Sequence, residues 1–226
     1  TQNLPVSLFI DRGGLVAEDG TTHHGAFDFA FLRHVPNMVV MAPKDENELQ
    51  HMVKTCLHHE GPASVRYSRG SVWGVPMDAE PTALPIGQGE LLREGHDVAL
   101  IAIGITVLPA LQAAERLEEE GISAAVVNAR FVKPLDHTLI ARVAGRAKCL
   151  MTVEEGCRMG GFGSAVLESL SEQGIGNLPT KVLGLPDQYV EQGPQDLLRA
   201  QHGLTADGIY EEAKDLLTKV QVEERF

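Results

Sequence analysis

Residues Ile10–Phe29 read I-D-R-G-G-L-V-A-E-D-G-T-T-H-H-G-A-F-D-F, a polar and glycine-rich stretch between two apolar ones. The apolar run before it, at 6–10, predicts a short buried strand, and residues 26–33 predict a helix with an apolar face. Four glycines, three acids, one arginine and two adjacent histidines lie between these elements. Because ligands of open α/β sheets usually bind at the carboxyl ends of strands, this loop predicts a site for a polar ligand.

The composition excludes several classes of partner. A chain of 226 residues can form one large domain or two small ones, and its net charge of -12 argues against nucleic acid or an anionic membrane as a partner. Three cysteines without Cys-x-x-Cys spacing argue against structural zinc and against a disulfide framework. Because neither a signal peptide nor an apolar run of about 18 residues is visible, we expect a cytoplasmic location.

Alternating strands and helices predict a parallel sheet in the first part of the chain. Further strands are expected at 38–41 and 63–68, separated by a helix that starts at a capping-box-like Asp45 and runs to about His58. A proline-rich segment with little hydrophobic periodicity follows, which predicts an extended linker.

A second α/β unit begins after this linker. It is expected to start with a hairpin between 89–93 and 97–103, and to contain further strands at 124–127, 149–153 and 180–183. Helices are expected at 106–120, 136–144, 162–170, 194–201 and 205–220. Together these elements predict a doubly wound domain with a five-strand, mostly parallel sheet.

The domain boundaries follow from these patterns. We expect a first unit at 1–76, a linker at 77–86 and a second unit at 87–226. A parallel sheet rarely places its functional loop after a single strand, so we also expect the chain to be the tail of a longer one.

Four side chains are candidates for binding or catalysis. Arg12 and Arg69 follow strands that end at the same sheet edge, and guanidinium groups suit phosphate or carboxylate. An alternative is that Arg12 merely pairs with a nearby acid, and that Arg69 is a solvated arginine before a glycine turn. His23 could serve as a general acid or base because imidazole titrates near neutrality, or it could be a metal ligand. The alternative, which we favour for at least one of His23 and His24, is a surface pair that caps the helix starting near Gly25. Asp19 precedes Gly20, so a plain turn is the alternative there.

A glycine-rich turn at 160–163 lies between a strand and a helix. It could form an anion-binding nest, or it could be a tight turn that allows close packing, which we favour. The acids before it, Glu154 and Glu155, are expected to be a solvated pair or a subunit contact.

These motifs resemble the 1-deoxy-D-xylulose-5-phosphate synthase family along essentially the whole chain. The matching stretches are D-R-G-G-L-V at 11–16, D-G-T-T-H-H-G-A-F-D at 19–28, M-A-P-K-D-E-N-E at 41–48, V-R-Y-S-R-G at 65–70, and E-E-G at 154–156 with G-G-F-G at 160–163. Transketolases and 2-oxoacid dehydrogenase β chains share the fold and the last of these elements but not the D-G-x-T-H-x-G-x-F-D loop.

The resemblance implies a transketolase-like transferase that depends on thiamine diphosphate and magnesium (Mg2+). This enzyme condenses pyruvate with D-glyceraldehyde 3-phosphate and releases CO2, which begins non-mevalonate isoprenoid biosynthesis and serves thiamine biosynthesis. It implies a homodimer of three-domain subunits, in which 1–76 is the C-terminal part of a pyrimidine-binding domain and 87–226 a transketolase C-terminal domain.

The resemblance also implies roles for single residues. Arg12 and Arg69 would hold the acceptor phosphate, which supplies remote binding energy for orienting the aldehyde. Asp19 and His23 would contact the reacting part of the acceptor, with His23 as a proton shuttle. His24 varies in the family, and we assign it no role.

Cofactor and metal ligands are not expected in this chain. The family binds the cofactor diphosphate through a G-D-G motif with a downstream asparagine, and activates the cofactor through a glutamate early in the second domain. Neither pattern occurs here. We therefore expect the isolated chain neither to bind thiamine diphosphate tightly nor to turn over.

Other interpretations stay open. The chain could belong to another thiamine-diphosphate enzyme, such as a transketolase or a 2-oxoacid dehydrogenase β chain. It could be a non-catalytic dimerisation or regulatory module. A weaker alternative is a doubly wound binding domain whose 160–163 turn holds an anion.

Overall fold

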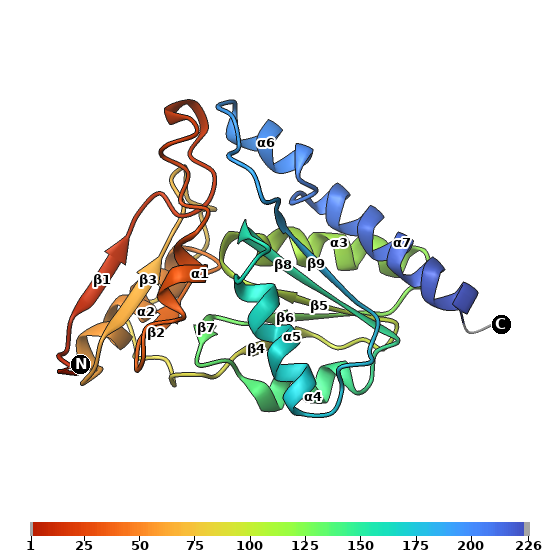
Figure 1. The fold of residues 1–226 in the computed structure, drawn as a ribbon, viewed down its shortest axis with the longest axis horizontal. Helices are drawn as coiled ribbons and strands as arrows, with labels where there is room; N and C mark the ends of the chain where they lie inside the picture. Colours follow the sequence, from red (N-terminus) through yellow and green to blue (C-terminus); the bar gives the residue numbers. More distant parts are fainter. Residues whose placement is uncertain (1, 224–226) are drawn as a thin grey trace.

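Two sheets organise residues 2–223, the part of the chain that the computed structural model describes (Figure 1). The first sheet has the strand order β1-β3-β2-β7, and the second has the order β4-β6-β5-β8-β9. The predicted α/β class, with a five-strand and mostly parallel second sheet, is confirmed.

The first sheet is built from β1 (Ser7–Ile10), β3 (Ala63–Arg66) and β2 (Val39–Met41), which run parallel. The prediction that the first strand is buried is wrong. β1 forms the edge of the sheet, and Leu8 and Phe9 are 38% and 44% exposed. An apolar run does not distinguish a central strand from an edge strand, whose burial depends on what covers it.

Two helices flank this sheet, α1 (Asp28–Leu32) and α2 (Glu46–His58). The predicted cap of α2 is confirmed, because the Asp45 carboxylate accepts a hydrogen bond from the backbone N–H of Glu48 at 2.7 Å. The Glu48 carboxylate in turn accepts from the backbone N–H of Lys44 at 2.8 Å. This reciprocal capping fixes where the chain turns from β2 into α2.

The second sheet contains β4 (Glu90–Arg93), β6 (Ala124–Asn128), β5 (Val98–Ala102), β8 (Cys149–Cys157) and β9 (Thr180–Leu185). The predicted hairpin is wrong, since β4 pairs antiparallel with β6 and not with β5. The turn between β4 and β5 lies against the start of β6, because the Asp97 carboxylate accepts a hydrogen bond from the backbone N–H of Ser123 at 2.7 Å. Every residue of β5 is buried, so this strand takes a central place between two parallel neighbours.

Helices cover both faces of the second sheet. The cluster on one face joins α3 (Val107–Glu119) and α7 (Ala206–Glu223) to the strands, and the cluster on the other joins α4 (His137–Ala144) and α5 (Phe162–Glu172). Phe29 and Leu32 of α1 belong to the second of these clusters. The two units therefore share a core.

The two units are also joined by a strand of the second unit that pairs within the first sheet. β7 (Phe131–Lys133), a strand that was not predicted, leaves the second unit and pairs antiparallel with β2. Phe131 is fully buried against the core of the first sheet. A strand of three residues is too short to show an alternating pattern of apolar and polar residues, so its sequence alone does not predict it. Its pairing depends on the strand edge that β2 offers.

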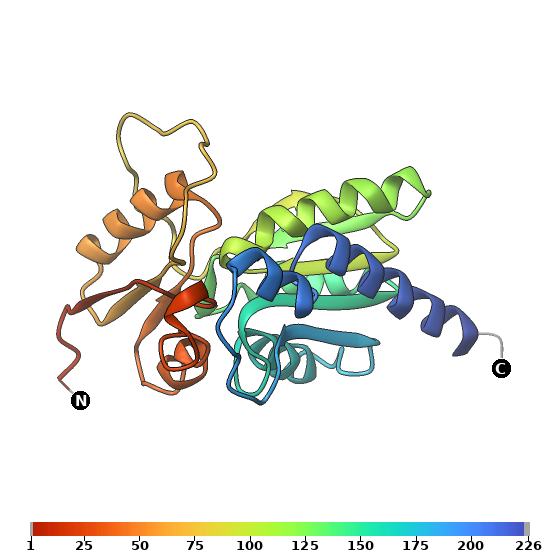
Figure 2. The same cartoon turned by 90° about the horizontal axis from the view of Figure 1, so that it is seen from above.

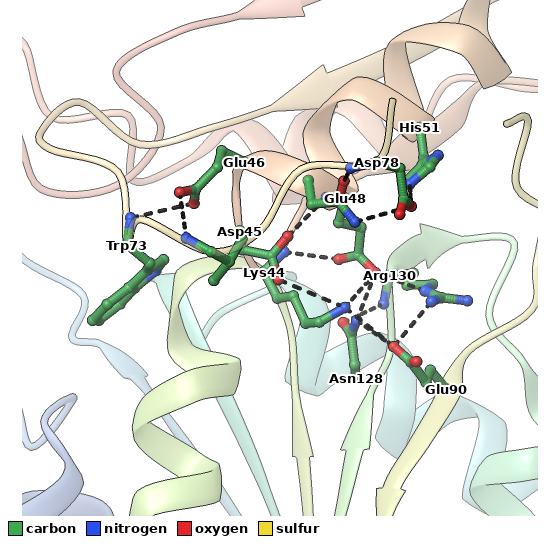
Figure 3. A network of polar contacts seen from close by, with 12 residues as sticks. Lys44, Asp45, Glu46, Glu48, His51, Trp73, Asp78, Glu90, Asn128 and Arg130 are labelled. Carbon is green, nitrogen blue, oxygen red and sulfur yellow. Dashed lines mark hydrogen bonds and ion pairs between the residues drawn. The ribbon is translucent and has the colours of Figure 1, made fainter. Parts of the chain in front are cut away.

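A network of charged side chains lies at this junction (Figure 3). The Glu48 carboxylate, whose side chain is 2% exposed, accepts from Arg130 Nε at 2.7 Å and from Asn128 Nδ2 at 2.8 Å. Arg130 Nη2 donates to Glu90 at 2.9 Å, and Lys44 Nζ lies 3.3 Å and 3.2 Å from Glu48 and Glu90. The network ties the start of α2 to β4 and β6.

The segment between the units, residues 67–89, has no regular secondary structure. Figure 2 shows it looping out beside α2. The Glu46 carboxylate accepts hydrogen bonds from the backbone N–H groups of Trp73, Gly74 and Val75, which holds this loop against the helix.

Candidate functional site

The residues singled out in the sequence gather at one edge of the first sheet. β1 and β3 run parallel, with Ile10 opposite Arg66, so their carboxyl ends lie together. Arg12 follows the first of these ends and Arg69 follows the second. Each side chain is a little under half exposed.

Asp19 joins the two arginines. It closes the short helical turn η1 (Ala17–Asp19), and its Oδ2 accepts from Arg12 Nη1 at 2.9 Å and also from Arg69 Nη1. The hydrogen bond from Arg69, together with the charges of Arg69, Arg12 and His23, lowers the pKa of Asp19 below its usual range despite some desolvation. Each guanidinium uses one nitrogen on this carboxylate, and a guanidinium carries five N–H donors.

The two histidines of the loop differ. His23 follows a turn in which its backbone N–H donates to the Gly20 carbonyl at 3.0 Å, and its Nδ1 lies 3.1 Å from the Thr22 hydroxyl. His24 Nδ1 accepts from the backbone N–H of Val16 at 3.0 Å, and its Nε2 lies 3.3 Å from the Glu191 carbonyl. His24 therefore holds the loop in place, while His23 is exposed and its charge contributes to the lowered pKa of Asp19.

Backbone contacts close the loop on itself. Gly14 and Gly25 exchange two backbone hydrogen bonds of 2.9 Å and 2.8 Å, and the N–H of Gly13 donates to the Tyr67 carbonyl at 2.9 Å. The last bond ties the arginine-bearing loop directly to the segment after β3. Arg12 and Arg69 thus belong to one connected backbone unit.

The sequence suggested that Glu154 and Glu155 form a solvated pair or a subunit contact, and this prediction is wrong. They are 0% and 1% exposed on β8. The Glu154 carboxylate accepts from the backbone N–H groups of Phe162 and Gly163 at 2.9 Å and 2.8 Å. The start of α5 is therefore occupied by a carboxylate of the chain itself, which supports the tight-turn interpretation of 160–163.

Burial raises the pKa of Glu154 to about 7, against the opposing effect of the Gly163 and Phe162 amides and of Arg66. Arg66, 2% exposed, pairs with Asp28 through its Nε at 2.8 Å and lies over the ring of Phe29. Its Nη2 also donates to the carbonyls of Gly25 and Glu155. This buried arginine connects β3, the loop and β8.

Two residues that contact the site were not singled out as functional. Glu155 and Gln195, which begins α6 (Gln195–Gln201), both contact the loop and the segment that carries Arg69. An acid inside an otherwise apolar strand is a signal that could have marked Glu155. Gln195 carries no comparable signal, because glutamine in a helix is ordinary.

Comparison with known proteins identifies both units. The family model of the transketolase C-terminal domain matches residues 87–209, and that of the transketolase pyrimidine-binding domain matches residues 1–73. The chain belongs to the transketolase family. A solved structure titled "Split gene transketolase, inactive beta4 tetramer" has a TM-score of 0.77 and 34% sequence identity, and covers 94% of this chain and 65% of that one.

Several relatives of this transketolase-family chain are named 1-deoxy-D-xylulose-5-phosphate synthase. It is 59% identical over 208 residues to 1-deoxy-D-xylulose-5-phosphate synthase 1 of Geobacter sulfurreducens, and 62% identical to the protein of that name from Geobacter metallireducens. It is 55% identical to the 1-deoxy-D-xylulose-5-phosphate synthase of Heliobacterium modesticaldum. These matches cover 92% to 95% of this chain but 33% of each relative, so the chain spans about a third of their length.

Proposed function

We propose that this chain is part of a 1-deoxy-D-xylulose-5-phosphate synthase and supplies the acceptor-binding residues of that enzyme. The complete enzyme would condense pyruvate with D-glyceraldehyde 3-phosphate, with loss of CO2. The observation that carries the proposal is the convergence of Arg12 and Arg69 on one point at the carboxyl edge of the first sheet. The names of the relatives point to the same reaction.

In this proposal, Arg12 and Arg69 hold the phosphate of the aldehyde. Both arginine side chains are a little under half exposed, and each guanidinium carries further N–H donors beyond the nitrogen used on Asp19. Charge-assisted hydrogen bonds from two arginines would fix the phosphate, and the aldehyde carbon would then lie at a fixed distance from it. Asp19 keeps the two guanidinium groups together between turnovers.

His23 would donate a proton to the aldehyde oxygen as the new carbon–carbon bond forms. An imidazole can hold that proton near neutral pH. Asp19 is kept ionised mainly by its hydrogen bond from Arg69 and by the charges of Arg69 and Arg12.

The cofactor ligands are assigned to other parts of the complete enzyme. Within residues 2–223, no three His, Cys, Asp or Glu side chains gather as a metal site would require. The sequence also lacks the G-D-G motif that holds the cofactor diphosphate in this family. The described residues of this chain therefore do not fit the diphosphate group of thiamine diphosphate or the Mg2+ bound to it.

The location and assembly are further parts of the proposal. No helix among the described residues is long and apolar enough to cross a bilayer. A cytoplasmic location, a homodimer and a role in thiamine biosynthesis stay predictions. The split-gene transketolase chain is, by its title, inactive as a β4 tetramer, which supports the expectation that this chain alone does not turn over.

The test is steady-state kinetics on the complete enzyme. Arg69→Ala should raise the KM for D-glyceraldehyde 3-phosphate by roughly tenfold or more, because a charge-assisted contact to phosphate is lost. The KM for pyruvate should stay within about twofold. Equal effects on both substrates would remove Arg69 from the acceptor site.

A further inference from the structure

Two side chains of the second unit each contact both segments that carry the candidate arginines. Glu155, at the end of β8, accepts from the backbone N–H of Leu15 at 3.3 Å through Oε1 and from the hydroxyl of Ser68 at 3.3 Å through Oε2. Leu15 lies three residues after Arg12, and Ser68 lies immediately before Arg69. One buried carboxylate therefore bridges the two segments.

Gln195, at the start of α6, makes a second bridge between the same segments. Its side-chain amide donates to the Leu15 carbonyl and, at 3.1 Å, to the Arg69 carbonyl. A glutamine amide has two N–H donors, and both are used here. Leu15 is thus held through its N–H by Glu155 and through its carbonyl by Gln195.

The bridging carboxylate is itself fixed. Arg199 Nε donates to Glu155 Oε1 at 3.0 Å, which compensates a charge whose side chain is 1% exposed. Gly14 has a φ of +83°, and a Cβ there would lie 2.6 Å from the Glu155 carboxyl carbon. The loop is therefore shaped to receive this side chain.

Further contacts from the loop between β9 and α6 support the same arginine-bearing loop. The Glu191 carbonyl lies 3.3 Å from His24 Nε2, and the ring of Tyr189 meets that of Phe27 edge-on, with centroids 6.1 Å apart. In Figure 1 the loop after β1 and the chain leading into α6 lie beside each other.

We infer that Glu155 and Gln195 are positioning residues for acceptor binding, through which the transketolase C-terminal domain sets the spacing of Arg12 and Arg69. This inference rests on the proposed function. Both arginine side chains are partly exposed, so their geometry depends on where their backbones are held. If the bridges are absent, the two segments must be ordered when the phosphate binds, and that ordering lowers affinity for the acceptor alone.

The test uses Gln195→Met in the complete enzyme. Methionine keeps the length of the side chain but cannot donate a hydrogen bond, and the residue is only partly buried, so the fold is retained. We expect the KM for D-glyceraldehyde 3-phosphate to rise roughly five- to tenfold as two hydrogen bonds are lost. The KM for pyruvate and kcat should stay within about twofold.

The matched control is Gln201→Met, the same substitution at an exposed position at the other end of α6, which should leave both KM values unchanged. Glu155→Gln is the second test variant and should again raise the acceptor KM selectively. A wild-type acceptor KM in Gln195→Met, or equal rises for both substrates, overturns the inference.

Arg69→Ala is measured in the same series. A selective effect of Arg69→Ala beside a wild-type Gln195→Met would remove the positioning role and leave the proposed function standing. No selective effect of Arg69→Ala would instead remove the proposed function.

Discussion

Gly14 shows how one residue can set the geometry of the candidate site. Its positive φ of +83° suits glycine, and the Glu155 carboxyl group lies where a side chain would begin. Gly14→Ala should destabilise the fold by about 2–3 kcal/mol, because backbone strain and steric overlap add. Urea unfolding of the isolated chain measures this change.

The control for Gly14 is Gly121→Ala. Gly121 has a similar φ of +78°, but nothing lies within 4 Å of the added Cβ. Gly121→Ala should lower the free energy of unfolding by about 1 kcal/mol, because only backbone strain contributes there. Equal costs at the two positions would mean that Glu155 moves aside without penalty.

Glu154 makes stability depend on pH. Burial raises its pKa from the ordinary 4.5 to about 7, so the folded state binds more protons than the unfolded state between these values. Stability should therefore fall as the pH rises through this window and should level off above it. Glu154→Gln cannot titrate, so wild type should lose stability relative to this variant between about pH 5 and pH 7.

Unfolding free energies at several pH values test this prediction, with Glu172→Gln, an exposed position on α5, as the control. A constant difference between wild type and Glu154→Gln over the whole range would show that Glu154 stays ionised throughout.

At the scale of elements, local patterns predicted most of the fold. Apolar runs located the central strands, and the helices predicted to begin at Asp45 and at residue 136 agree with α2 and α4. The Asp45 and Asp136 carboxylates each accept a backbone hydrogen bond there. Pairing partners were beyond local sequence. The hairpin assigned to β4 and the missed β7 both depend on which distant strand offers a free edge.

The candidate site divides in the same way. Arg12 and Arg69 could be predicted together because parallel strands end at one edge. Glu155 and Gln195 could not be predicted in this way, because they contact Leu15 from 140 and 180 positions further along the chain. Sequence periodicity carries no information about such pairs.

The charged network between α2, β4 and β6 should contribute to stability. Arg130→Met removes the ion pairs of Arg130 with Glu48 and Glu90 and leaves the buried Glu48 carboxylate with fewer hydrogen-bond donors (Figure 3). We expect a loss of about 2 kcal/mol in urea unfolding, since Lys44 and Asn128 still compensate part of the charge. Arg142→Met, at an exposed ion pair 3.9 Å from Glu94, should cost less than about 0.5 kcal/mol. Similar values for both would mean that the network adds nothing at this junction.

At the scale of the whole molecule, the proposed function assigns the acceptor site and the cofactor ligands to different parts of the complete enzyme. The arginine-bearing segments follow the paired strands β1 and β3 and are held by Glu155 and Gln195 of the second unit, so the acceptor half should be preformed in this chain. The cofactor half should not be, because no G-D-G motif is present.

Isothermal titration calorimetry on the 226-residue chain separates these two halves. Thiamine diphosphate with Mg2+ should give no saturable heat, because the chain offers neither the diphosphate motif nor the activating glutamate that the family uses. D-Glyceraldehyde 3-phosphate should bind weakly, with a Kd in roughly the millimolar range expected when a single phosphate group is held without a closed pocket, and Arg69→Ala should abolish this binding. Micromolar binding of thiamine diphosphate would place cofactor ligands on this chain and contradict the division.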